Sequence, residues 1–105
     1  MLRLSDMLRS QERLEEVRRA GYDSFAASWM SQSAVVRELE MVGEGARRIS
    51  SPLRKHHPEV EWEKMRGFSS FSKHEYWRIR PELVWNAVIE VPALKDKRAQ
   101  ITASS

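Results

Sequence analysis

Apolar residues recur every three or four positions over most of this chain, which is the spacing of one face of an α-helix. The first stripe starts near Leu4 and stops before Gly21, a residue that favours the end of a helix. No stretch alternates for long enough to predict a sheet, so the expected fold class is all-α, a bundle of four to five helices. The stripes predict helices over 4–18, 34–49 and 62–76 and from Pro81 onward.

Short polar segments between these stripes predict turns and shorter helices. Residues 22–29 predict a break followed by a short helical piece that runs through Trp29. Ser50-Ser51-Pro52 has the composition of an N-cap with proline in the first turn, so one or two helical turns are expected over 53–57, ended by Pro58. In the last helix a kink is expected at Pro92, because proline has no amide hydrogen to donate.

The expected core lies mostly between helix 34–49, helix 62–76 and the last helix. We expect Trp62, Phe68 and Trp85 to be largely buried there. A chain of 105 residues fits one domain, predicted over 1–101 with a frayed tail at 102–105. Because a bundle of this size gains stability from association, we also expect a two-fold homodimer.

Composition narrows the classes of protein that remain. The chain contains no cysteine, which excludes disulfides, cysteine-ligated metal centres and cysteine nucleophiles and fits a cytoplasmic protein. It has no apolar run long enough to cross a membrane and no secretory signal at its start. The net charge is +3 from 18 basic and 15 acidic residues. Most of the basic residues are arginines, which favour two-pronged contacts with phosphate.

The histidines are the first candidates for chemistry. His56 and His57 are adjacent in a short polar segment, and adjacent helical positions do not share a face. We expect this pair to be solvated surface, and no metal site is predicted from it. Glu44 lies between two glycines and is expected to face inward and to pair with an arginine.

His74 lies in a different setting, among arginines, a lysine, hydroxyls and aromatic rings. An imidazole can transfer protons near neutral pH, Arg66 and Lys73 can hold a phosphate, and Tyr76 can stack on a base. These residue types suit metal-free cleavage of RNA. The plain alternative is a helix end rich in solvated charge, and a Ser70–His74 nucleophile pair has no third orienting group in sight.

The order of motifs resembles a known family. The chain is similar to the HepT-like proteins of the HEPN superfamily, the toxin half of HepT–MNT toxin–antitoxin modules, over about residues 4–100. His74-Glu75-Tyr76 matches the His-x-Tyr of that family. The other matching runs are Ser33 to Ala46, Pro58 to Trp62, Pro81 to Trp85 and Pro92 to Lys95.

This resemblance implies a HEPN-type helical bundle that forms a homodimer, with the motif helices of both subunits around a shared cleft. The implied activity is that of a metal-independent endoribonuclease in a type VII-like module, with RNA as substrate and no cofactor. A minimal nucleotidyltransferase is the implied antitoxin, which binds the toxin or transfers AMP to it. By position, His74 is the implied catalytic histidine and Tyr76 the tyrosine that receives AMP. Ser70, Lys73 and Arg78, chosen for their residue types around His74, are the candidate RNA-binding residues.

One position departs from the family pattern. An arginine is expected five residues before His74, and Ser69 stands there. Serine supplies neither the charge nor the fork of donors that arginine offers a phosphate. Three interpretations remain open: Arg66, three residues earlier, replaces it; the chain is an inactive relative that keeps its partner surfaces; or the position was changed to disarm a toxic protein.

The function therefore stays open between three classes. The chain is a ribonuclease toxin, or it is a catalytically inactive dimeric partner and AMPylation target of a nucleotidyltransferase. The third class is an unrelated nucleotide-binding helical domain that shares only the scaffold.

Overall fold

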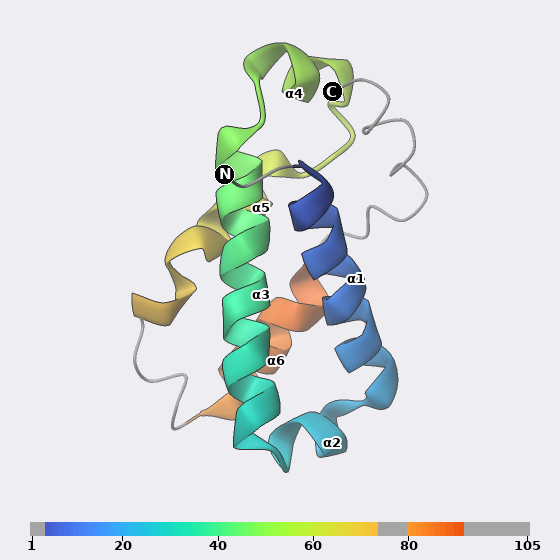
Figure 1. The fold of residues 1–105 in the computed structure, drawn as a ribbon, viewed down its shortest axis with the longest axis vertical. Helices are drawn as coiled ribbons and strands as arrows, with labels where there is room; N and C mark the ends of the chain where they lie inside the picture. The colour runs from blue at the N-terminus through green and yellow to red at the C-terminus, as the bar shows by residue number, and fades with distance from the viewer. Residues whose placement is uncertain (1–3, 74–79, 92–105) are drawn as a thin grey trace.

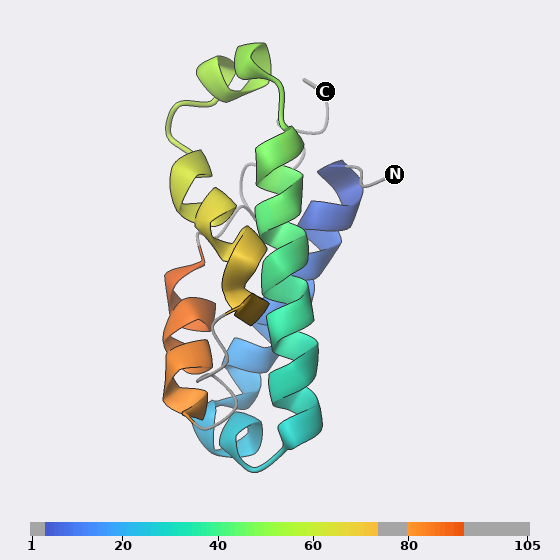
Figure 2. The same ribbon diagram turned by 90° about the vertical axis from the view of Figure 1, so that its left-hand side faces the viewer.

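The structure is a computed structural model that describes residues 4–73 and 80–91. Helix α1 (Leu4–Ala20) runs antiparallel to the long helix α3 (Trp29–Arg48), and the short α2 (Tyr22–Ala26) joins them at one end (Figure 1). At the other end α4 (Ser51–His56) leads into α5 (Trp62–Arg66) and the 3-10 helix η1 (Gly67–Lys73), which pack along α3. Helix α6 (Pro81–Glu90) lies behind α1 and α3 in the view of Figure 1 and stands at the left in Figure 2.

The predicted all-α class is confirmed, since the described ranges hold only helices and their connections. They contain six α-helices and one 3-10 helix. This is more than the four to five expected, because the short helices at 22–26, 51–56 and 62–66 are counted beside the three longer ones. The short helical piece was expected to run through Trp29, and the prediction of this end was wrong, because α2 ends at Ala26. Ser28 instead caps α3, with its Oγ accepting from the Ser31 amide at 3.2 Å.

Two other predicted boundaries hold. Gly21 ends α1 with a φ of 93°, a left-handed value that residues with a side chain rarely adopt. Ser50 caps α4 by accepting from the Leu53 amide at 3.3 Å, and Pro52 stands in the first turn. Helix α6 ends at Glu90, because the residue before Pro92 is pushed to extended backbone. Pro92 itself, where a kink was expected, lies outside the described residues.

The core differs from the expectation in one respect. Helix α1 also belongs to the core, through the buried Met7, Leu8 and Leu14. Gly45 makes this possible, because a Cβ at that position would stand 2.6 Å from the Cβ of Met7. Arg18 also ties α1 to the C-terminus of α6, donating to the carbonyl oxygens of Val88 at 2.9 Å and Ile89 at 2.8 Å.

Two predictions about single side chains were wrong. Trp62 and Phe68 are buried as expected, whereas Trp85 is only partly buried because it packs at the edge of the core against the rings of Tyr22 and Phe25. His57 is 5% exposed rather than solvated. Its carbonyl oxygen accepts from Nε1 of Trp62 at 3.0 Å, so the chain folds back over it.

None of the described helices is both long enough and apolar enough to cross a membrane. The predicted single domain over 1–101 remains a prediction, as does the tail at 102–105, which lies outside the described ranges.

Candidate functional site

The segment that leads into His74 is not the single α-helix predicted over 62–76. Helix α5 stops at Arg66, and 67–73 continue as 3-10 turns with a kink at Ser70, whose φ is −115° and ψ is 20°. Glycine and serine explain the change. Both are poor in helix interiors, and serine hydroxyls compete for the backbone groups that an α-helix would pair.

Apolar side chains hold this segment against the bundle. Met65 is fully buried and Phe68 is 8% exposed, while Phe71 packs partly buried at the margin of the same core. Of these three, Phe68 was predicted from the sequence to be buried, and its burial is confirmed. The polar residues between them are consequently left at or near the surface: Ser69 and Ser70 are partly exposed, and Lys73 is exposed.

Gly43 of α3 permits the closest approach in this region. A Cβ at that position would stand 2.6 Å from the Cα of Ser69 and 2.7 Å from the carbonyl carbon of Phe68, and still closer to the Ser69 amide nitrogen. Atoms do not approach a Cβ that closely, so a residue with a side chain cannot occupy position 43 without moving η1. The position of Ser69 is therefore set by the backbone of α3.

One helical turn after Gly43, Arg47 reaches the same serine. Its Nη1 donates to the Oγ of Ser69 at 3.4 Å, which is near the outer limit for a hydrogen bond. Arg47 is exposed, and no carboxylate among residues 4–73 and 80–91 forms an ion pair with it. The sequence analysis did not identify Arg47. Its only signal was Gly43, one turn earlier on the same helix face.

Arg66, the substitute suggested by the sequence, is engaged elsewhere. Its Nη1 donates to Oε1 of Glu63 at 2.6 Å, and its Nε is buried without a hydrogen-bond partner. Glu44 likewise pairs with Arg48, at 3.7 Å. The pairing was predicted, but the inward direction was wrong, because 42% of the Glu44 side chain is exposed.

The predicted site residues are thus only partly placed. Ser69, Ser70 and Lys73 lie together on η1, and Arg66 lies on the helix before it. His74, Tyr76 and Arg78 lie outside the described residues, so their roles stay predictions. Among the side chains that the structure does describe, no three histidine, aspartate or glutamate residues are grouped to hold a metal ion.

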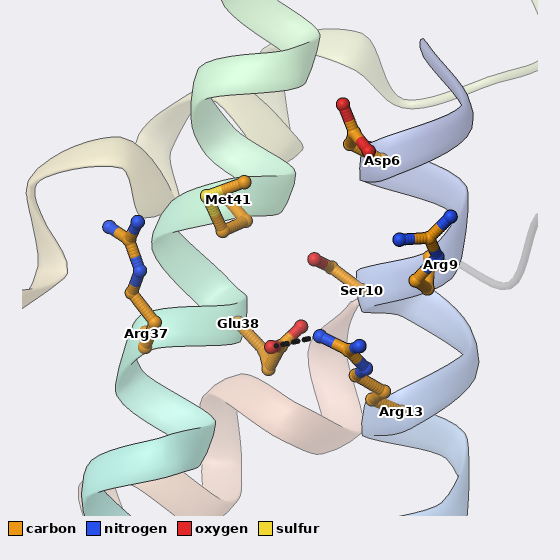
Figure 3. Close-up of a pocket in the computed structure, with 7 residues that line it drawn as sticks. All are labelled: Asp6, Arg9, Ser10, Arg13, Arg37, Glu38 and Met41. Carbon is orange, nitrogen blue, oxygen red and sulfur yellow. Dashed lines mark hydrogen bonds and ion pairs between the residues drawn. The ribbon is translucent and has the colours of Figure 1, made fainter. Parts of the chain in front are cut away.

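A separate pocket of about 210 Å³ lies between α1 and α3 (Figure 3). Arg13 donates from Nη1 to Oε1 of Glu38 at 3.0 Å across it, whereas Arg37 points away from this pair (Figure 3). The other oxygen of Glu38, Oε2, is buried without a hydrogen-bond partner. None of the site residues predicted from the sequence lines this pocket, which is formed by Asp6, Arg9, Ser10, Arg13, Arg37, Glu38 and Met41.

The described part of the motif therefore presents a small polar surface on a rigid support. It carries two hydroxyls, one lysine and a guanidinium from the neighbouring helix. Such groups can donate hydrogen bonds to phosphate oxygens and offset their charge. None of these described groups is a histidine, the side chain that most often transfers protons near neutral pH.

Comparisons with known proteins agree with this picture. A family model described as "Ribonuclease HepT-like" matches residues 7–101. A Thermococcus cleftensis protein named "Probable ribonuclease HepT" is 31% identical over 96 residues, covering 90% of this chain and 87% of its own. A Methanocaldococcus jannaschii protein with RNase in its name is 35% identical over 94 residues, covering 88% and 86%. No solved structure gives a significant match.

Proposed function

We propose, because the chain belongs to the HepT-like ribonuclease family, that it is a metal-independent endoribonuclease of the HEPN class. The observation that supports this most directly is the contact between Arg47 and Ser69, at 3.4 Å. It brings a guanidinium to the segment that leads into His74, where an RNA phosphate would need a positive charge. The family expects that charge at position 69 itself.

In the proposed reaction the 2′-hydroxyl of RNA attacks the adjacent phosphorus. The new bond joins the 2′-oxygen to phosphorus, and the bond from phosphorus to the 5′-oxygen breaks. The 2′-hydroxyl loses its proton and the leaving 5′-oxygen gains one, so the products are a 2′,3′-cyclic phosphate and a 5′-hydroxyl. His74 is the proposed proton-transfer group, and arginine offsets the charge that builds on the phosphate oxygens.

The test is cleavage of an RNA oligonucleotide in EDTA by this chain and by its His74→Ala variant. His56→Ala is the matched control, because His56 is an exposed histidine on α4. We expect cleavage by the unchanged chain and the control but not by His74→Ala. Intact RNA with all three proteins, or full activity of His74→Ala, contradicts the proposal.

We further assign this chain to the toxin half of a cytoplasmic toxin–antitoxin module whose antitoxin is a minimal nucleotidyltransferase. Tyr76 is the proposed acceptor of AMP. Incubation of the chain with that partner and ATP, followed by intact-mass analysis, should add the mass of AMP to the unchanged chain and not to Tyr76→Phe. No complex and no added mass would contradict this assignment.

The proposal includes a homodimer. Large apolar side chains at the end of the bundle support association, since Trp29 is 73% exposed and Met30 is 63% exposed, and burying apolar surface is favourable. Light scattering at micromolar concentration should give twice the mass of one chain. A monomer at that concentration contradicts this part of the proposal.

A second candidate function is favoured by Ser69. If the serine abolishes cleavage, the chain is an inactive dimeric partner and AMPylation target of the nucleotidyltransferase. The two functions separate in the assays above, because the inactive partner would accept AMP at Tyr76 and leave RNA intact.

A further inference from the structure

From the packing of α3 against η1, we infer that Arg47 is the residue that binds the substrate phosphate in this chain. Arg47, on the neighbouring helix, would then bind the phosphate in place of the arginine that the family pattern expects at position 69. The inference rests on the proposed function. It adds a substrate-binding residue that lies 22 positions away from Ser69 in the sequence and outside the motif.

The position of Arg47 is fixed from the backbone upward. Gly43 and Arg47 are one helical turn apart on the same face of α3, and the backbone of Ser69 lies against Gly43. Arg47 therefore leaves α3 directly beside Ser69. Phe68, 8% exposed, anchors η1 next to this point, so the spacing between the arginine and the motif segment is held by packing.

The guanidinium of Arg47 is also available. A guanidinium has five N–H donors. Within residues 4–73 and 80–91 the Arg47 guanidinium makes one side-chain hydrogen bond, and it is long, at 3.4 Å. It forms no ion pair with any carboxylate in the described parts of the chain. A phosphate could displace the serine hydroxyl and take two parallel hydrogen bonds, which are stronger because both partners are charged.

The neighbouring arginines are less suited to this role. Arg66 donates to Glu63 at 2.6 Å, and Arg48 pairs with Glu44 at 3.7 Å. Each would have to give up a carboxylate before it could bind a phosphate. Lys73 carries a charge on the same segment, but an ammonium offers no planar fork of donors.

The test measures two quantities on the full chain and its variants. The first is the single-turnover rate of RNA cleavage in EDTA. The second is binding to a 2′-O-methylated copy of the same oligonucleotide, which lacks the attacking hydroxyl and cannot be cut. Arg47→Ala is compared with Arg48→Ala, a matched control on the same helix, and thermal unfolding confirms that both variants are folded.

We expect Arg47→Ala to cleave about 100- to 1,000-fold more slowly, the usual effect of removing one charge-stabilising donor. The dependence of binding on salt should weaken by about one unit of slope. Arg48→Ala should change neither quantity by more than about twofold, as expected for an exposed residue without substrate contact. In the Arg47→Ala background, Ser69→Arg should restore at least about tenfold of the lost rate, because it returns a guanidinium to the same place.

The outcomes separate this inference from the function on which it rests. If the unchanged chain cleaves and Arg47→Ala matches it in rate and binding, the inference is overturned and the ribonuclease stands. If the unchanged chain leaves RNA intact while Arg47→Ala alone weakens binding, Arg47 holds the phosphate and the ribonuclease fails. If RNA is cleaved only after Ser69→Arg, and Arg47→Ala does not change binding to the methylated oligonucleotide, both the role of Arg47 and the ribonuclease activity of the unchanged chain are overturned.

Discussion

The backbone of Ser69 lies against Gly43 so closely that a Cβ at position 43 would stand 2.6 Å from the Cα of Ser69. This approach sets the distance between α3 and η1. It also places Arg47, one turn further along α3, where its Nη1 meets the Ser69 hydroxyl. A glycine without a chemical role thus determines how the motif segment meets its neighbour.

Gly43→Ala should therefore destabilise the protein. Alanine gains about 1 kcal/mol over glycine in a helix, but overpacking costs about 1–3 kcal/mol, and here the clash is with backbone that cannot rotate away. The net expectation is a loss of up to about 2 kcal/mol in the free energy of unfolding, measured by urea denaturation.

Gly67→Ala is the control for that measurement. A Cβ at Gly67 meets nothing within 4 Å, and its φ of −62° suits alanine. It should stabilise the protein by about 0.4–1 kcal/mol, because alanine restricts the unfolded chain. Equal effects of the two substitutions would show that the approach at Gly43 does not constrain η1.

The ion pair between Arg13 and Glu38 should matter more than other pairs on the surface. Glu38 has one carboxylate oxygen buried without a partner, and Arg13 compensates its charge at 3.0 Å while being 56% exposed. Arg13→Ala should lower the free energy of unfolding by about 1 kcal/mol, the upper part of the range for a partly exposed pair. Adding Glu38→Met should recover that loss, since no buried charge then remains.

Arg19→Ala provides the comparison, because Arg19 pairs with Glu15 at 3.3 Å on an exposed helix face. Arg19→Ala should lower the free energy of unfolding by about 0.3–0.5 kcal/mol. If Arg13→Ala with Glu38→Met is no more stable than Arg13→Ala alone, the burial of Glu38 is not the cause of the cost.

The stability of the fold should depend on pH through one contact at the start of α6, between Arg80 and Glu82. Hydrogen bonding from Arg80, whose Nε lies 2.8 Å from Oε1, lowers the pKa of Glu82 from its usual 4.5, and the amide of Glu82 itself adds to this. A carboxyl with a lowered pKa in the folded state stabilises the fold above its unfolded pKa. That stabilisation is lost as the pH falls through the folded pKa.

Arg80→Ala should therefore raise the pKa of Glu82 towards 4.5, as measured by NMR titration of its side-chain carboxyl. The variant should also lose less stability between neutral pH and pH values below that pKa. Arg48→Ala should leave the titration of Glu82 unchanged. A Glu82 pKa that is the same with and without Arg80 would contradict this explanation.

The sequence predicted the features that depend on local pattern. The stripe from Val35 to Ile49 predicted a helix, and Gly21 and Ser50 predicted where helices end and begin, because side-chain spacing and capping act within a few residues. The 3-10 turns after Arg66 were missed, since the same apolar spacing fits an α-helix. They follow from the glycine and serines of 67–70, whose low helix propensity the apolar spacing does not register.

A different limit explains what was missed at the site. Ser69 was identified as the unusual position from the motif alone. Arg47 could not be identified, because its contact with Ser69 joins residues 22 positions apart through a close approach that only the folded chain shows. His57 was misjudged for a similar reason: its burial follows from the chain folding back to Trp62, whereas its neighbours in sequence are polar.

The central claim, metal-free cleavage of RNA through His74, is tested most directly by the ends of the products. An RNA oligonucleotide is incubated with the full chain in EDTA, and the fragments are analysed by mass spectrometry beside a His74→Ala control. The account predicts paired fragments that end in a 2′,3′-cyclic phosphate and begin with a 5′-hydroxyl, and none with His74→Ala. Intact RNA, or fragments with 5′-phosphate and 3′-hydroxyl ends, would contradict it.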